Sequence, residues 1–300
     1  MPPALAKSYG YCRTLARRAG NFYFAFWSLP RDQYWAMCAL YGFARLVDDA
    51  GDDPTTTLSQ RAAALNQWRT DLTAALAGET ERHIVFPALV ETVRKYQIPP
   101  EYLYSLIQGV ELDLLPVSFA SYADLSRYCY HVAGVIGLCC IHIWGFTDDR
   151  AREAAILCGD AFQLTNILRD LKEDGFNGRC YLPQEDLDQF NYSREDLAGE
   201  VRDERFIRLM TFEVQRARSL YGRGGEIIRY LSPAGRPIFD TMFKLYHGLL
   251  DEIERRNYDV FTRRVRLTTW KKVRLAFGGI LQKWKTGWSS QSPFTPSAPS

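Results

Sequence analysis

Apolar residues recur at three- and four-residue spacing along most of the chain, and runs that alternate with a period of two are scarce. The first spacing is that of an amphipathic helix with one buried face, whereas the second would indicate half-buried strands. The pattern therefore predicts an almost entirely α-helical protein. The expected helices span 5–18, 31–50, 57–77, 82–96, 99–114, 121–145, 148–174, 203–230, 232–257 and 269–284.

Prolines separate these expected helices, because proline lacks an N–H group and does not fit a helix interior. The segment 175–191 loses the helical periodicity through glycine, asparagine and proline, and we expect a loop there. Residues 289–300 are rich in serine and proline and low in charge, which is typical of a disordered tail. No repeat or linker interrupts the rest, so the sequence predicts a single helical domain, 1–288.

The composition excludes several classes of protein. With 47% hydrophobic residues the chain can form a large core, and a formal net charge of +2 does not indicate nucleic-acid binding. Seven cysteines without C-x-x-C spacing, and no recognisable secretory signal, favour the reducing cytoplasm. The longest apolar stretch, 133–146, is shorter than the roughly 20 residues of a membrane span and is expected to be a buried helix.

The first acidic cluster lies near the end of an expected helix, in the segment YGFARLVDDAGDD (41–53). Asp48 and Asp52 are one helical turn apart and share a face, on which Tyr41 and Arg45 also lie. An isolated D-D-x-x-D pattern can equally be a solvated helix end. Carboxylates at a helix C-terminus are disfavoured by a few tenths of a kcal/mol each by the helix dipole, so we expect a cation nearby.

The second cluster lies in FQLTNILRDLKEDGFNGRCYLP (162–183). Asn166, Asp170 and Asp174 follow one another in successive helical turns, and Gln163 precedes them by nearly one turn. Apolar residues flank this stripe on both sides. Because burying an unpaired carboxylate costs several kcal/mol, an inward-facing stripe of this kind requires cations or a metal ion.

Two such helices can face each other across a helical bundle, as metal sites in bundle cores do. Hard oxygen ligands without histidine or thiolate favour Mg²⁺ over zinc or copper. Mg²⁺ that is held by a few carboxylates and completed by water and phosphate is the usual arrangement for diphosphate substrates. The two clusters together therefore indicate a magnesium-dependent enzyme acting on a diphosphate.

Several segments resemble the squalene/phytoene synthase family of head-to-head prenyl transferases. They are NFYFAFWSLP (21–30), ALYGFARLVDDAGD (39–52), YCYHVAGVIG (128–137), FQLTNILRDLKEDGFNGRCYLP (162–183) and DEIERRNYDVFTRRVRL (251–267). Within the family the chain resembles most the bacterial presqualene diphosphate synthases of hopanoid pathways. The segments that carry this finer likeness are LIQGVELDL (106–114), AFQLTNILRDLKED (161–174) and YDVFTRRVRL (258–267).

The resemblance implies an isoprenoid-synthase-type helical bundle with a central cavity. It implies that two farnesyl diphosphates are joined head to head to presqualene diphosphate, with release of diphosphate, Mg²⁺ as cofactor and no need of NADPH. The implied Mg²⁺ ligands are Asp48, Asp52, Asn166, Asp170 and Asp174. Implied substrate-binding residues are Phe22, Phe26, Gln163, Arg169, Tyr181, Tyr246 and Arg263. Tyr41, Arg45 and Tyr130 are implied to be catalytic, together with Asp48, Asp52, Asp170 and Asp174.

The chain departs from the family pattern at two places. Residues 17–21, Arg-Arg-Ala-Gly-Asn, stand where many members carry a polar and basic His-Ser-Lys-Ser-like segment. Gly51 lies inside the first acidic motif, where relatives usually have a bulkier residue, and glycine weakens a helix by roughly 1 kcal/mol. We therefore expect the helix to end early or to bend at this point.

Other functions fit the same residues. The alternatives within the family are a phytoene synthase acting on two geranylgeranyl diphosphates and an NADPH-dependent squalene synthase. The alternative outside catalysis is a silent helical assembly factor, which the retained aspartates disfavour because a scaffold needs no ion-binding oxygens. Residues 263–288 interleave basic and apolar side chains, which suits either a peripheral membrane contact or a helix packed on the body.

Overall fold

The structure is a computed structural model that describes residues 1–19, 23–115 and 117–267. These residues form helices joined by short connections, and no strand occurs among them beyond a single bridge between Phe146 and Leu231. The all-α fold class is thereby confirmed. The helices are α1 (Pro3–Ala19), α2 (Arg31–Asp52), α3 (Leu58–Ala77), α4 (Phe86–Tyr96), α5 (Pro100–Leu112), α6 (Tyr122–Cys129), α7 (Val135–Trp144), α8 (Arg150–Phe176), α9 (Gln184–Gln189), α10 (Arg194–Ala198), α11 (Glu204–Gly224) and α12 (Arg236–Arg255).

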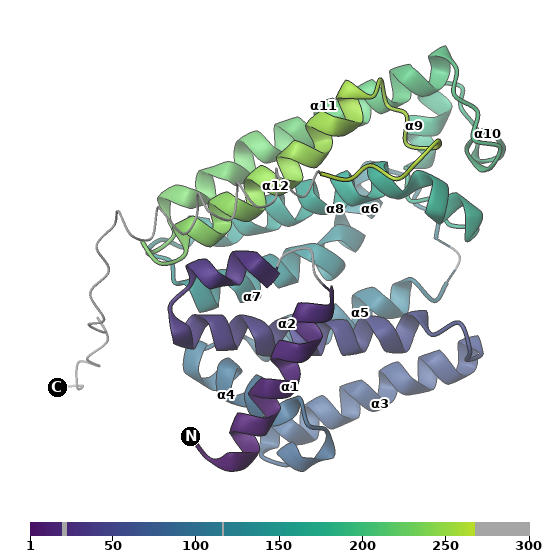
Figure 1. The fold of residues 1–300 in the computed structure, drawn as a ribbon. Helices are drawn as coiled ribbons and strands as arrows, with labels where there is room; N and C mark the ends of the chain where they lie inside the picture. The colour runs from purple at the N-terminus through teal and green to yellow at the C-terminus, as the bar shows by residue number, and fades with distance from the viewer. Residues whose placement is uncertain (20–22, 116, 268–300) are drawn as a thin grey trace.

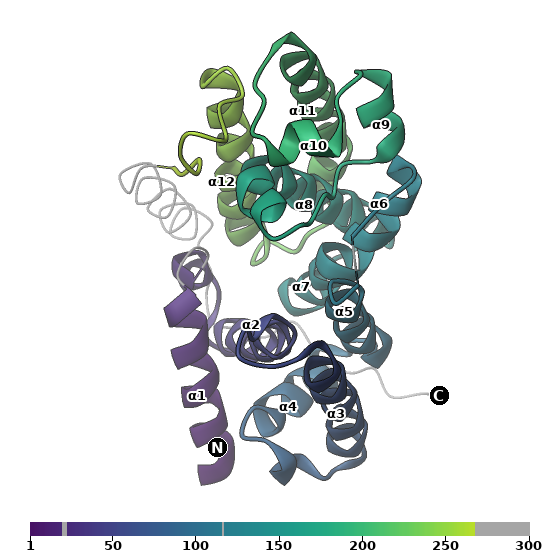
Figure 2. The same cartoon turned by 90° about the vertical axis from the view of Figure 1, so that its right-hand side faces the viewer.

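The helices are arranged in two tiers. One tier consists of α1–α5 and α7, and the other consists of α6 and α8–α12 (Figures 1 and 2). Within the first tier, α2, α5 and α7 lie nearest to the other tier (Figure 1). The apolar interior is correspondingly divided into two clusters, one around Phe43 and Phe86 and the other around Phe206 and Tyr221. Helix α8 contributes side chains to both clusters. It therefore joins the two tiers, as does α12, whose Phe239 belongs to one cluster and whose Leu250 belongs to the other.

Most helix positions agree with the periodicity, and the differences have local causes. The single helix expected over 121–145 is interrupted by a π-helical turn (Tyr130–Gly134) between α6 and α7. The expected loop 175–191 contains α9, whose six residues are too few to show a helical period. Short 3-10 helices form at Tyr23–Ser28 (η1) and Thr80–Arg82 (η2), and the expected helix 203–230 ends in one at Gly225–Arg229 (η4). The expected helix 269–284 and the tail 289–300 lie outside the described residues.

Gly51 does not end α2 early, contrary to the expectation, since the helix continues to Asp52. The glycine is buried, and a Cβ atom at this position would lie 2.3 Å from Cγ1 of Val110 on α5. A larger residue would push these two helices apart. The glycine is therefore explained by the close contact of α2 with α5.

The stretch 133–146 contains all of α7, most of whose residues are buried, in agreement with the sequence. None of the helices in the described part of the chain has both the length and the apolarity needed to cross a bilayer. All seven cysteines are buried and free.

The π turn and the first turn of α7 pack on α8 through backbone contacts. A Cβ atom on Gly159 would lie 2.8 Å from Cα of Gly134, and one on Gly137 would lie 3.0 Å from the carbonyl oxygen of Ala155. Backbone cannot move aside as a flexible side chain can. Glycine at 159 therefore sets how closely the π turn and α8 approach each other.

Replacing Gly159 with alanine is expected to destabilise the fold by about 1–3 kcal/mol, the usual cost of overpacking a filled interior. The matched control is Gly222→Ala in α11, because a Cβ there meets nothing within 4 Å. Alanine at that helical position should stabilise the protein by roughly 0.5–1 kcal/mol. Thermal unfolding followed by circular dichroism measures both, and equal melting temperatures for the two variants would contradict the close contact.

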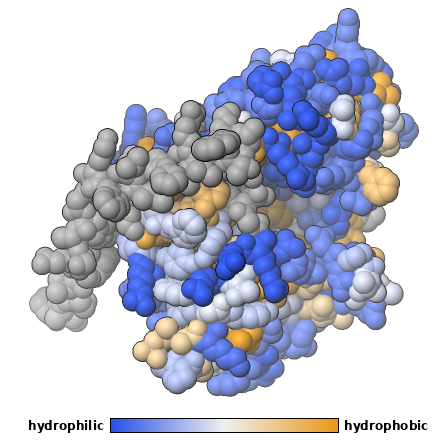
Figure 3. Space-filling view, in the orientation of Figure 1, coloured by the Kyte–Doolittle hydropathy of each residue, from blue (hydrophilic) through white to orange (hydrophobic). Residues whose placement is uncertain are grey.

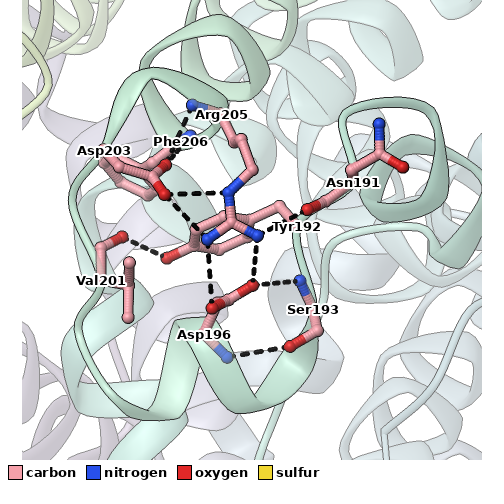
Figure 4. A network of polar contacts seen from close by, with 8 residues as sticks. All are labelled: Asn191, Tyr192, Ser193, Asp196, Val201, Asp203, Arg205 and Phe206. Carbon is pink, nitrogen blue, oxygen red and sulfur yellow. Dashed lines mark hydrogen bonds and ion pairs between the residues drawn. The ribbon is translucent and has the colours of Figure 1, made fainter.

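The end of the molecule formed by α9–α11 is largely hydrophilic on the face shown in Figure 3. There the guanidinium group of Arg205 donates to Asp196, Asp203 and the backbone oxygen of Asn191 (Figure 4). Asp203 also caps the first turn of α11, and Asp196 completes a capping box with Ser193 at the start of α10. This network fixes the short helices against α11, and its charged groups satisfy one another.

Candidate active site

A cavity of about 300 Å³ lies between the two tiers of helices. Its walls come mainly from α2, α7, α8 and α12, with contributions from η1, α5, the π turn and η4. The lining is mostly apolar, which suits a hydrocarbon chain. The polar residues on the wall are few, and they include Asp48 of α2 and both Gln163 and Asn166 of α8.

Helical periodicity explains how two helices reach this cavity over several turns. On α2 the lining residues are 37, 40, 41, 44 and 48, and on α8 they are 155, 158, 159, 162, 163 and 166. Spacings of three and four residues keep each set on one face of its helix. Asp52 continues the α2 stripe, and Asp170 and Asp174 continue the α8 stripe. The two oxygen-rich clusters are thus the ends of two stripes that line one cavity.

Asp48 is the member of the first cluster that lies on the cavity wall. Burial raises its pKa to about 7, opposed by the charge of Arg45 and reinforced by Asp52 and Asp49. Arg45 itself lies at the surface and pairs with Asp49 at 2.6 Å. A cation therefore accompanies the acidic helix end, as the dipole argument requires, but it does not neutralise Asp48 directly.

Asp174 lies in a similar environment at the end of the second cluster. Burial raises its pKa to about 7, and the charge of Asp170 adds to the effect. Asp170 differs, because Arg169 and Arg264 both donate two hydrogen bonds to its carboxylate. Asn166 donates to Gln163 at 3.4 Å and faces the cavity.

Two residues without a role in the sequence prediction lie between the clusters. Burial raises the pKa of Asp113, at the end of α5, while hydrogen bonds from the hydroxyls of Tyr128 and Tyr181 lower it. Arg179 pairs with Asp52 at 3.6 Å and interacts electrostatically with Asp113 and Asp174. Arg179 therefore bridges the acidic ends of α2 and α8.

Aromatic rings form much of the cavity wall. Phe26 and Tyr41 meet edge to face with ring centroids 6.2 Å apart, and Phe162 stacks on Tyr246 at 4.2 Å. Burial raises the pKa of both tyrosine hydroxyls, so these phenols stay protonated. Phe162 is absent from the predicted set, although it directly precedes Gln163 in the matched motif. Its position four residues before Asn166 is the signal that could have identified it.

The cavity wall does not include the predicted residues Tyr130, Arg169, Tyr181 and Arg263. Phe22 is outside the described residues. Tyr130 does not line the cavity, and its ring lies 5.5 Å from that of His131. Arg263 is exposed, and the next residue, Arg264, is the one that pairs with the second cluster. Neighbouring residues of an irregular segment point in different directions that no periodicity predicts. The sequence therefore did not show which of the two arginines contacts the second cluster.

The donor set suits a cation that a ligand helps to hold. Across residues 1–19, 23–115 and 117–267, no three His, Cys, Asp or Glu side chains form a ready-made metal site. The carboxylates are instead divided between two helices, and burial, reinforced by neighbouring acids, raises the pKa of Asp48 and Asp174. Mg²⁺ is typically bound by one or two carboxylates and by substrate phosphates. These residues therefore fit Mg²⁺ delivered with a diphosphate.

Comparison with known proteins agrees with this geometry. The model of the squalene/phytoene synthase family matches residues 15–271. The 15-cis-phytoene synthase of Synechococcus elongatus is 37% identical, with 90% of this chain and 91% of that protein covered. The phytoene synthase of Arthrospira platensis is 36% identical, with 91% of this chain and 92% of that protein covered.

Solved structures show the same fold. A dehydrosqualene synthase superposes with a TM-score of 0.84 over 95% of this chain and 98% of that one, at 24% identity. The squalene synthase HpnC from Alicyclobacillus acidocaldarius superposes with a TM-score of 0.80 over 86% of this chain and 97% of that one, at 28% identity. The chain therefore belongs to the squalene/phytoene synthase family and is an enzyme that transfers prenyl groups.

Proposed function

We propose that this enzyme joins two geranylgeranyl diphosphates head to head to form phytoene, with Mg²⁺ as cofactor and without NADPH. The observation that carries the proposal is the meeting of two oxygen-rich helix stripes, ending in Asp52 and Asp174, at one apolar and aromatic cavity. The choice of the C20 substrate is supported by the phytoene synthases that are 36–37% identical over about nine tenths of the chain.

The reaction begins when the C1–O bond of one substrate breaks and its electron pair leaves with the diphosphate. Arg45, Arg179 and Arg264 surround the acidic end of the cavity and can donate hydrogen bonds to the leaving oxygens. Asp48, Asp52, Asn166, Asp170 and Asp174 are the residues that would hold Mg²⁺. When bound, Mg²⁺ stabilises the negative charge that develops on the diphosphate.

The allylic cation left behind needs walls that attract positive charge without reacting with it. Neutral aromatic faces do this, at about 0.5–2 kcal/mol each. Phe26, Tyr41, Phe162 and Tyr246 supply such faces, and the protonated phenols of the two tyrosines do not add to the cation. The C2–C3 double bond of the second substrate attacks the cation, and loss of a proton closes a cyclopropane ring.

In later steps the second diphosphate leaves with the electron pair of its C–O bond and the ring opens, and the resulting cation loses a second proton to form the central double bond. Because the two tyrosine phenols keep their protons, the departed diphosphate is the base within reach of the first proton. Tyr130 is not among the residues that line the cavity, so this proton transfer is assigned to the diphosphate.

Purified enzyme is expected to convert geranylgeranyl diphosphate to phytoene with Mg²⁺ alone. The assay offers C15 and C20 diphosphates separately, with and without NADPH, and identifies the extracted lipids by mass spectrometry. Presqualene diphosphate from the C15 substrate, with no product from the C20 substrate, would instead establish the second candidate. That candidate is favoured by the likeness to the squalene synthase HpnC at 28% identity. No product from either substrate would leave the assembly-factor alternative.

A location at the cytoplasmic face of a membrane belongs to the same proposal. A C40 hydrocarbon product has to be delivered to an apolar phase, and residues 263–288 carry the basic and apolar side chains suited to a lipid surface. Most of that segment lies outside the described residues. Co-sedimentation of the purified enzyme with anionic vesicles tests the contact.

A further inference from the structure

Asp170 has its carboxylate fully occupied by arginine. Arg169 donates from Nε and Nη2 at 2.8 and 2.5 Å, and Arg264 donates from the same two atoms at 2.9 Å each. Each carboxylate oxygen thus accepts two hydrogen bonds, and a carboxylate offers about four acceptor positions in all. A metal ion can bind Asp170 only after at least one guanidinium group has moved away.

Arg264 is held in this place by its own segment. The segment 256–267 follows α12 and contacts α8. Two of its own side chains, Phe261 and Val265, are buried. Lys172 of α8 donates to the backbone oxygen of Phe261 at 2.8 Å, and Arg264 also pairs with Glu173 at 3.0 Å. The backbone of the segment is therefore fixed on α8. The side chain of Arg264 is exposed and can leave Asp170 by changing its rotamer.

Within the residues that the structure describes, no carboxylate of the first acidic cluster is held by two arginines in this way. Arg45 pairs with Asp49 and not with Asp48, and Arg179 approaches Asp52 only to 3.6 Å. The side chain of Asp52 is 67% exposed, whereas that of Asp170 is 16% exposed. The two halves of the site consequently differ in how readily they accept a cation.

Diphosphate is the ligand that can displace Arg169 and Arg264 from Asp170. Guanidinium groups bind phosphate through the same pair of parallel hydrogen bonds with which they bind carboxylate. A diphosphate at the acidic end of the cavity competes for Arg169 and Arg264, and their transfer exposes Asp170 to a cation. A cation arriving alone has to break two bidentate ion pairs without replacing them.

We propose that Arg169 and Arg264 form a latch on Asp170 that a diphosphate opens, so that Asp170 accepts a divalent cation only when diphosphate is bound. This rests on the proposed function, since it concerns the same site and its diphosphate ligand. The latch keeps the α8 half of the site free of metal until substrate arrives. Coupling of this kind is reciprocal, so the cation strengthens diphosphate binding by the same factor.

The test is Mn²⁺ binding to the full-length protein, followed by the electron paramagnetic resonance signal of free Mn²⁺. Binding is measured with and without inorganic diphosphate, after subtraction of the manganese–diphosphate complex formed without protein. Wild type is expected to bind Mn²⁺ at least about 10-fold more tightly with diphosphate, within the range usual for coupled sites. Arg264→Gln is expected to bind Mn²⁺ alone about 10-fold more tightly than wild type and to lose most of the gain from diphosphate.

Two further variants separate the latch from bulk charge. Arg264→Lys keeps the positive charge but loses the bidentate fork, so the latch predicts an intermediate gain and a charge effect predicts none. Arg266→Gln removes an exposed positive charge from the same segment and should leave Mn²⁺ binding unchanged. Equal Mn²⁺ affinities of wild type and Arg264→Gln without diphosphate, or the same gain in Arg266→Gln, would overturn the latch and leave the proposed function intact. Failure of every variant to bind Mn²⁺ with diphosphate would overturn the proposed function itself.

Discussion

Replacing Asp48 with asparagine is expected to reduce turnover by about 10³-fold while leaving the helices intact. Asp48 is the carboxylate of the first cluster that lies on the cavity wall, where it can share in holding the cation that stabilises the leaving diphosphate. Asparagine keeps the shape of the side chain but removes its negative charge. Product formation from the C20 diphosphate at saturating Mg²⁺ measures the loss.

The same substitution is expected to stabilise the protein, and the effect depends on pH. The pKa of Asp48 is about 7 in the folded protein and 3.8 in a free side chain, mainly because of burial. The folded protein therefore binds more protons than the unfolded chain between these values, and the stability of wild type falls as the pH rises from about 4 to 7. Asp48→Asn should raise the melting temperature at pH 8 and change it little at pH 4.

Asp53→Asn is the matched control, because Asp53 lies at the end of the same motif, does not line the cavity and accepts hydrogen bonds from Thr55. It should retain turnover and show no added stability at pH 8. If Asp48→Asn retained the activity of the control, Asp48 would have no part in the reaction.

The positions of the two acidic stripes could be predicted from sequence because both lie on long, regular helices. The spacing of Tyr41, Asp48 and Asp52, and of Asn166, Asp170 and Asp174, determines which residues share a face before any tertiary contact exists. The apolar neighbours of each stripe then indicate which face turns inward. Helical periodicity does not show what the two stripes face. The expectation that both face one central cavity came from the family resemblance.

Residues outside those helices could not be placed in this way. Asp113 lies at the end of α5, Arg179 lies in the connection after α8, and Arg264 lies in an irregular segment after α12. Their positions depend on how these segments pack on the helix ends, which no local period encodes. The π turn is a further example, because α6 and α7 have the sequence pattern of one continuous helix. The wider π turn is recognised only in the structure, where it packs against Gly159.

A buried cluster of charges behind α8 gives the second large expected effect. Arg216 of α11 pairs with Asp186 of α9 at 2.6 Å and with Glu213 at 2.8 Å, and its guanidinium group lies 4.3 Å from the ring centre of Tyr122. Asp186 is 2% exposed and Glu213 is fully buried. One arginine therefore faces two carboxylates that water does not reach.

Arg216→Met is expected to cost about 3–5 kcal/mol, because it leaves the buried Asp186 without its cation and removes the hydrogen bonds from the guanidinium group to Glu213. At roughly 2–4 °C per kcal/mol this corresponds to a fall of about 6–20 °C in the melting temperature. The triple variant that adds Glu213→Gln and Asp186→Asn should recover most of the loss, since it removes the unpaired charges. An Arg216→Met protein that melts with wild type would show that Arg216 does not neutralise the pair.

Glu213→Gln alone is expected to stabilise the protein above neutral pH, because the second carboxylate exceeds what one arginine can neutralise. Burial raises the pKa of Glu213 to about 8 from 4.5, and this outweighs the lowering effect of Arg216. Stability of wild type should therefore fall as the pH rises from about 4.5 to 8, since the unfolded chain releases the proton first. The glutamine variant should lack this part of the pH dependence, so its melting temperature should exceed that of wild type by an amount that grows across the window. Melting curves at pH 5 and pH 9 measure the difference, and an advantage of the same size at both would mean that Glu213 is charged throughout.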